Sequence, residues 1–210
     1  MQYLAIPIGY LIGALPMGYL YLLLFKRQDI TQIGSGRTGG TNAMRAGGFG
    51  LGLLTGLSDI AKGYLAVALA YWLAPDNIWL QVLSGVAAVA GHNWSLWLYW
   101  WTGKLSAGAG TGPNVGAAMF FWPVLFWIEA PLVAFVVLVI GYASLASIAA
   151  AVGLILIFTL RYFQLGEPVE LIYYGIMTSG LVMWALRSNI QRLLKGEERR
   201  VGVFARKKSP

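Results

Sequence analysis

Residues 3–25, "YLAIPIGYLIGALPMGYLYLLLF", form a continuous apolar stretch without a charged side chain. A helix rises about 1.5 Å per residue, so this stretch is long enough to cross a hydrocarbon core of about 30 Å. No basic segment precedes it, and no small-residue cleavage motif follows it before Lys26, so it is unlike a secretory signal peptide. We therefore expect a first membrane-spanning helix here.

The rest of the chain has the composition of a membrane protein. Of its 210 residues 58% are hydrophobic and only 11% are charged, and the mean hydropathy is +0.67. Further apolar runs cover residues 50–74, 79–101, 114–127, 130–142, 145–160 and 170–186. We expect an all-α integral membrane protein with about seven transmembrane helices, and Pro131 in the first turn of the helix over residues 130–142. This transmembrane part is expected to cover residues 1–186.

The net charge of +7 is distributed unevenly. A basic tail over residues 187–210 contains Arg187, Arg192, Lys195, Arg199, Arg200, Arg206, Lys207 and Lys208. Beside a membrane span, such a tail indicates a cytoplasmic anchor near anionic lipid headgroups rather than a nucleic-acid site.

The remaining charges predict the orientation. One set of turns holds Lys26, Arg27, Arg37, Arg45 and Lys104, on the same side as the basic tail. The opposite turns hold Asp76, Glu129, Glu167 and Glu170, with Arg161 as their one basic residue. By the positive-inside rule, the first set is cytoplasmic and the N-terminus is outside.

Several kinds of chemistry are excluded by residue content. There is no cysteine and a single histidine, so the sequence predicts no disulfide, no thiolate nucleophile and no cysteine or histidine metal cluster. No P-loop and no Ser-His-Asp order is present. We expect no metal and no cofactor, and an enzyme of this sequence would position an activated substrate with cations and backbone amides.

Three polar segments rich in small residues lie on the expected cytoplasmic side, at residues 34–48, 102–116 and 141–147. Irregular backbone at membrane depth is stable only where it is buried in protein or lines a wet cavity. The three segments are therefore expected to line one site.

The first of these segments fits a phosphate cradle. Glycines allow backbone amides to approach an anion closely, and hydroxyl, amide and guanidinium groups can complete the site. The residues concerned are Gly34, Ser35, Gly36, Gly39, Gly40, Thr41, Asn42 and Arg45. A flexible loop, or small residues that permit tight helix packing, would explain the same composition.

Three ionisable residues fall inside or beside apolar runs. Asp59 and Lys62 lie three residues apart on one helical face and are expected to form a structural ion pair that supports the site. His92 is expected to be a packed, hydrogen-bonded residue, with a catalytic base as the alternative. Lys104 follows a tryptophan cluster typical of the membrane interface, where it would meet a phosphate or extend to the surface as an anchor.

The motifs together resemble a known family, the bacterial acyl-phosphate:glycerol-3-phosphate acyltransferases. "GSGRTGGTNAMR" (34–45) resembles its first cytoplasmic motif, and "LLTGLSDIAKG" (53–63) its Asp-x-x-Lys-Gly stretch. "GHN" (91–93) is similar to the start of the second motif, "YASLASI" (142–148) to most of the third, and "SNIQRLLKGEE" (188–198) to the closing segment.

This resemblance implies a seven-helix enzyme of the bacterial inner membrane. It would transfer an acyl chain from acyl phosphate to the first hydroxyl of glycerol 3-phosphate, giving lysophosphatidic acid and phosphate, with membrane lipid around it and without an obligate protein partner, nucleic acid or cofactor. The implied catalytic residues are Ser35, Arg45, Lys104 and Ser144. The implied substrate-binding residues are Gly36, Arg37, Gly39, Gly40, Thr41, Asn42, His92, Gly108, Gly110, Thr111, Asn114, Ser147 and Asn189.

The sequence departs from the family pattern at several positions. Arg37 replaces an asparagine of the first motif, and Leu186 replaces a histidine three residues before Asn189. Arg37 is expected to replace one lost charge from another direction. The family's second-motif lysine aligns with Lys104 when counted from His92, and with Ala109 when the glycines are aligned instead.

Two other classes of function fit parts of the sequence. A lipid-binding or transport protein that has kept the fold would also use glycine-rich ends of broken helices. A scaffold that recruits partners through residues 187–210 would leave the glycine-rich segments without a role. A cytoplasmic cleft that opens sideways to lipid favours acyl transfer, whereas a cavity open on both sides favours transport.

Overall fold

The computed structural model describes residues 1–201, and within that range it is helical, with one isolated β-bridge between Trp94 and Ser106. Arg206, Lys207 and Lys208 of the expected basic tail lie outside the described residues. The long elements are α1 (Ala5–Ala14), α2 (Met17–Lys26), α4 (Phe49–Leu73), α5 (Ile78–Asn93), α7 (Thr111–Phe121), α8 (Leu125–Phe135), α9 (Ala143–Leu165) and α10 (Glu170–Ala185). The short ones are η1 (Gln2–Leu4), η2 (Ile30–Gln32), α3 (Gly40–Gly47), α6 (Leu96–Thr102), the π-helical η3 (Val136–Ile140) and α11 (Arg187–Leu194).

Three helical stretches in the described part of the chain are long and apolar enough to cross a bilayer. They are Gln2–Lys26, Phe49–Leu73 and Ala143–Leu165. The apolar helix Leu125–Ile140 is shorter. Large hydrophobic side chains such as Trp72, Trp127 and Phe163 are exposed on the outside of these helices, as expected for a surface that faces lipid.

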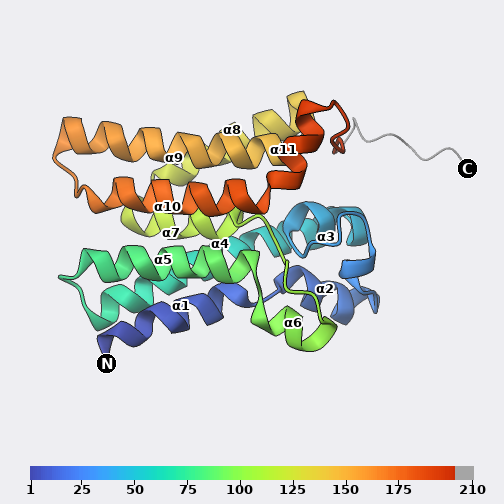
Figure 1. Cartoon of the computed structure of the whole chain (residues 1–210), viewed down its shortest axis with the longest axis horizontal. Helices are drawn as coiled ribbons and strands as arrows, with labels where there is room; N and C mark the ends of the chain where they lie inside the picture. The colour runs from blue at the N-terminus through green and yellow to red at the C-terminus, as the bar shows by residue number, and fades with distance from the viewer. Residues whose placement is uncertain (202–210) are drawn as a thin grey trace, which may run out of the picture.

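The long helices lie side by side, and the polar segments gather at one end of them (Figure 1). Helices α2, α3, α6 and α11 lie at this end, whereas the N-terminus lies at the other. We call it the polar end and define it by residues 26–48, 94–110, 141–144 and 186–201. The fold therefore brings together segments from both halves of the sequence.

Helix α4 is central to the bundle and contacts α1, α2, α3, α5 and α7. Its backbone approaches α7 very closely, because a Cβ at Gly63 would overlap the carbonyl of Pro113 and a Cβ at Gly116 would overlap that of Ile60. Lipid tails are as apolar as the helices, so the hydrophobic effect does not drive helices together within a membrane. Close packing of small residues drives their association instead. The close fit holds the start of α7 against the middle of α4.

The first span is broken, which corrects the expectation of a continuous helix. Helix α1 ends at Ala14 and α2 begins at Met17, with Leu15 and Pro16 between them. Proline has no N–H group and cannot continue the hydrogen-bond ladder. The carbonyl of Ala14 accepts a hydrogen bond from Ser95 Oγ, and that of Leu15 accepts one from Lys62 Nζ at 2.9 Å.

The turn between α7 and α8 is not where we expected it from the sequence. The structure turns at residues 122–124, within an apolar run, because Trp122 and Pro123 are themselves hydrophobic and hide the turn. Pro131 therefore lies inside α8 and not in its first turn, and Glu129 is buried in α8 and not in a loop. Arg161 lies inside α9, where it pairs with Glu167 and stacks on Trp122.

Candidate active site

The first glycine-rich loop, residues 33–39, is held in shape by one buried side chain. Asn42 on α3 accepts a hydrogen bond from the Ser35 N–H at 3.0 Å through its Oδ1. Its Nδ2 donates to the carbonyls of Ile33 and Arg37, both at 2.9 Å. Gly34 has the left-handed φ of +59° and lies against Asn42, where a Cβ would collide with Oδ1. Asn42 thus fixes the backbone that presents Ser35, which is exposed.

Helix α3 carries the next three predicted residues. Its start is pressed against α4, since a Cβ at Gly40 would lie only 2.9 Å from the carbonyl of Gly52. Thr41 and Arg45 are exposed one turn apart on this helix. Partial desolvation of its guanidinium by the surrounding protein, and then the charge of Arg199, lower the pKa of Arg45 from its ordinary value. A cation here lies beside other cations, which favours an anionic ligand.

The second segment is joined to the first by hydrogen bonds. The N–H of Thr38 donates to the carbonyl of Ala107 at 2.7 Å, and its hydroxyl donates to the same oxygen at 3.2 Å. Lys104 extends to residue 31 and donates from Nζ to the carbonyl and hydroxyl of Thr31 at 3.0 and 3.1 Å. Ala109 packs against an apolar cluster of Ala151, Val182 and Leu186. Position 104 therefore provides the cation of this segment.

The third segment meets the end of the chain at Glu198, a residue that the sequence analysis did not select. Ser144 Oγ donates to Glu198 Oε1 at 3.2 Å, and Asn189 Nδ2 donates to the same oxygen at 2.7 Å. Arg192 Nε donates to Oε2 at 2.8 Å. The signal was present, because Glu198 belongs to the quoted closing motif together with Asn189 and Arg192, but Ser144 lies 54 positions away in the chain.

Arg37 links the first loop to α10. Its NH2 group donates to the carbonyl of Ala185, in the last turn of that helix, at 2.7 Å. Burial, followed by the positive charge of Arg192, lowers the pKa of Arg37 from its ordinary value. A cation at a helix C-terminus is stabilised by the helix dipole. The guanidinium of Arg37 therefore lies beside Ala185, the residue that precedes Leu186.

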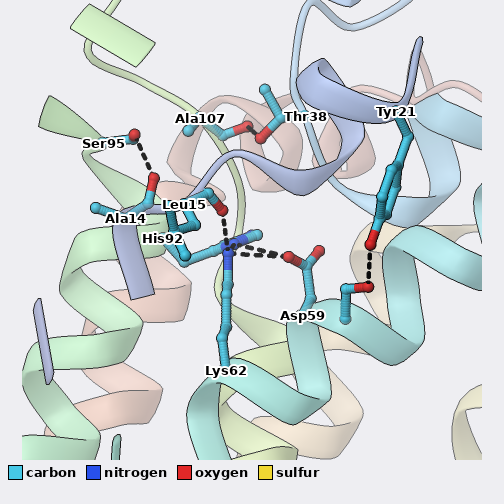
Figure 2. Close-up of polar contacts among 10 residues, drawn as sticks. Ala14, Leu15, Tyr21, Thr38, Asp59, Lys62, His92, Ser95 and Ala107 are labelled. Carbon is cyan, nitrogen blue, oxygen red and sulfur yellow. Dashed lines mark hydrogen bonds and ion pairs between the residues drawn. The ribbon is translucent and has the colours of Figure 1, made fainter. Parts of the chain in front are cut away.

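Below the polar end lies a buried cluster of Asp59, Lys62 and His92 (Figure 2). Lys62 Nζ lies 2.9 Å from Asp59 Oδ1, 2.8 Å from His92 Nδ1 and 2.9 Å from the carbonyl of Leu15. The predicted ion pair and the packed, hydrogen-bonded histidine are both confirmed. A Cβ at Gly108 would overlap the His92 ring, so the second segment rests directly on this cluster.

Some predicted residues have their polar groups directed elsewhere. Asn114 is buried in α7 and accepts hydrogen bonds from the Tyr174 hydroxyl at its carbonyl and at Oδ1, at 2.8 and 2.9 Å. Ser147 donates to the carbonyl of Ala143 in its own helix. Gly110, with a left-handed φ of +86°, is the N-cap of α7, and the Thr111 hydroxyl is buried without a hydrogen-bond partner among the described residues. Gly36 turns the first loop with a φ of +72°, and Gly39 caps α3.

The chemistry of the polar end follows from these contacts. The polar end carries the cations Arg37, Arg45, Lys104, Arg192 and Arg199, together with the exposed hydroxyl residues Ser35 and Thr41. Guanidinium and ammonium groups bind phosphate strongly, and arginine does so through two parallel hydrogen bonds. The site is suited to a phosphate-bearing molecule whose apolar part lies among the helices.

Comparisons with known proteins agree with this chemistry. Residues 3–196 match the sequence profile of a family described as glycerol-3-phosphate acyltransferase. The glycerol-3-phosphate acyltransferase of Parasynechococcus marenigrum (strain WH8102) is 40% identical over 202 residues, which cover 96% of this chain and 91% of that protein. That of Synechococcus sp. (strain CC9605) is 42% identical over 211 residues, with 97% and 95% covered.

Solved structures extend the comparison to the fold. The crystal structure of PlsY, an integral membrane glycerol 3-phosphate acyltransferase, in its glycerol 3-phosphate form superposes with a TM-score of 0.84 at 28% identity, over 96% of both chains. Its lysophosphatidic acid form gives a TM-score of 0.83 at 27% identity, over 97% of both. The expected all-α integral membrane fold is confirmed. The chain belongs to the glycerol-3-phosphate acyltransferase family.

Proposed function

We propose that this protein transfers an acyl group from an acyl phosphate to the first hydroxyl of glycerol 3-phosphate. The hydroxyl oxygen forms the new ester bond with the acyl carbon, the bond from that carbon to the phosphate oxygen breaks, and the products are lysophosphatidic acid and hydrogen phosphate. The names of the relatives, and the glycerol 3-phosphate and lysophosphatidic acid forms of the similar structure, support the acceptor and the product. An already activated donor suits a site of cations and amides.

One observation carries this proposal: hydrogen bonds join the first and second segments to each other and tie the first to α10. Thr38 is bonded to Ala107, Arg37 to Ala185 and Lys104 to Thr31. Their cations and amides are therefore fixed before substrate arrives. Such preorganised charge stabilises the negative charge that develops on the acyl oxygen and on the leaving phosphate. Among the predicted residues, Ser35, Arg45, Lys104 and Ser144 are proposed to contact the reacting groups.

A groove for the acyl chain runs along α4 beside the site. It has a volume of about 290 Å³ and is lined almost entirely by apolar atoms. The lining residues are Met44, Phe49, Gly52, Leu53, Gly56, Leu57, Ile60 and Phe126. Met44 is next to Arg45 in the chain, so an acyl chain in the groove would end beside the cations of the polar end. A groove on the side of the bundle supports acyl transfer over transport.

The orientation and the number of spans belong to the same proposal. Seven spans are formed by α1 with α2, α4, α5, α7, α8 with η3, α9 and α10. The basic residues Lys26, Arg27, Arg37, Arg45 and Lys104 all lie at the polar end, which supports a cytoplasmic site and an external N-terminus in a bacterial inner membrane.

Phosphate release tests the proposal. Purified protein in lipid is given palmitoyl phosphate with and without glycerol 3-phosphate, beside the Arg45→Ala variant. We expect release that requires the acceptor and disappears in the variant. Absence of release across several chain lengths, from protein shown to be folded, would reject the acyl-phosphate donor.

A further inference from the structure

The segment after α11 folds back across the polar end. Glu198 is held there by the three hydrogen bonds from Ser144, Asn189 and Arg192. Three residues later, the Val201 N–H donates to the carbonyl of Gly141 at 2.9 Å, and the Val201 side chain is buried. The contacts of Glu198 on one side and of Val201 on the other therefore fix the backbone of Arg199.

From this position Arg199 contacts the first glycine-rich loop. Its NH1 group donates to the carbonyl of Gly34 at 2.6 Å. Arg45 lies against the same glycine, with its Cδ 3.8 Å from the point where a Cβ of Gly34 would be. Two arginines, one from α3 and one from the end of the described chain, thus flank the residue that precedes Ser35.

The two guanidinium groups are unneutralised. In residues 1–201 neither Arg45 nor Arg199 forms an ion pair with a carboxylate, and neighbouring Glu198 is already engaged by three donors. The contact with Gly34 uses one of the five N–H groups of the Arg199 guanidinium, which leaves the others available for a ligand. The positive charge of Arg199 acts on Arg45 more strongly than the negative charge of Glu198 does, so the pair favours the binding of an anion.

We propose that Arg199 binds the phosphate group of glycerol 3-phosphate together with Arg45. This inference rests on the proposed function for the identity of the ligand. Arg199 is exposed at the polar end, where a water-soluble acceptor arrives, whereas the donor is held in the membrane by its acyl chain. The end of the chain therefore completes the acceptor site and is not only a basic membrane anchor.

The test compares two adjacent arginines in the full-length protein in lipid nanodiscs. Arg199→Ala removes the proposed ligand, and Arg200→Ala removes an equal charge from a side chain that instead contacts Tyr142. Equilibrium binding of radiolabelled glycerol 3-phosphate is measured without any acyl donor. Glycerol, which lacks the phosphate group, is the control ligand. We expect Arg199→Ala to weaken glycerol 3-phosphate binding about tenfold or more, as for loss of a hydrogen bond to a charged group, and Arg200→Ala to bind like the wild type.

Kinetics and a conservative variant complete the test. With acyl phosphate as donor, Arg199→Ala should raise the KM for glycerol 3-phosphate and leave that for the donor unchanged, and Arg199→Lys should recover part of the binding. Equal binding by the wild type and by folded Arg199→Ala, or a rise in the donor KM alone, would overturn the inference. If the wild type forms no product but its acceptor binding depends on Arg199, the donor assignment fails and the role of Arg199 stands.

Discussion

Arg37 and Ala185 are 148 positions apart in the chain, yet the guanidinium of one lies 2.7 Å from the carbonyl oxygen of the other. This contact joins the first glycine-rich loop to the last turn of α10. Because the arginine is part of the loop that also presents Ser35, the position of α10 and the shape of the loop depend on each other.

Arg37→Met should therefore impair catalysis more than folding. A hydrogen bond made by a charged group contributes about 1.5–3 kcal/mol, so we expect kcat/KM to fall about tenfold to a hundredfold. Steady-state kinetics with both substrates, and the melting temperature in detergent, are the measurements. Arg187→Met, which removes an exposed arginine of α11, is the control. Normal kinetics in Arg37→Met would mean that the contact has no role in the site.

Lys62→Met should destabilise the protein strongly. Lys62 provides hydrogen bonds or ion pairing to Asp59, His92 and the carbonyl of Leu15, so its loss leaves a buried carboxylate without its cation. Breaking such a buried pair costs about 3–5 kcal/mol. Thermal unfolding in detergent should show a large fall in melting temperature. The exposed Lys195→Met variant should melt like the wild type, and a Lys62→Met variant that did the same would show that the cluster is dispensable.

Gly56→Leu should shorten the acyl chain that the enzyme prefers. A Cβ at Gly56 meets nothing within 4 Å, so a side chain there fills the groove without disturbing the helices. Each displaced methylene loses about 0.8 kcal/mol of burial, so displacing two of them lowers activity on palmitoyl phosphate about tenfold. Rates are compared across donors of increasing chain length. Gly180→Leu, in an equally open position on α10, is the matched control, and identical chain-length profiles would argue against this groove.

Glu198→Ala should lower activity more than Glu198→Gln does. The glutamine retains an oxygen for Ser144 and Asn189 but loses the charge opposite Arg192, whereas alanine loses all three contacts. We expect kcat/KM to fall about tenfold or more in the alanine variant. Glu197→Ala changes the exposed neighbour and should have little effect. Equal rates in the two alanine variants would contradict a role for Glu198.

The helical membrane fold could be predicted because it depends on local composition. Uninterrupted apolar runs and the placement of charges indicate spans and ends without any tertiary contact, and the pair Asp59 and Lys62 is visible from helical spacing alone. The turn at residues 122–124 was missed because tryptophan and proline keep the run apolar through it. Glu129 was misplaced for the same reason.

The site could be predicted only as a set of segments. The sequence indicated that residues 34–48, 102–116 and 141–147 belong together, and the structure places their ends at the polar end of the bundle. It could not indicate which side chains face one another. Asn42 shapes the loop backbone, Asn114 faces Tyr174, and Glu198 binds Ser144 of the third segment, all through contacts that no sequence pattern reveals.

The break at Leu15 and Pro16 also bears on how the protein is made. The carbonyls of Ala14 and Leu15 obtain their donors from Ser95 and Lys62, which leave the ribosome much later than the first span. Until then a bilayer offers these oxygens no water in its apolar core. The bent form of the first span therefore depends on donors from α4 and from the residue that precedes α6, so we expect it to form only after both of these have been inserted.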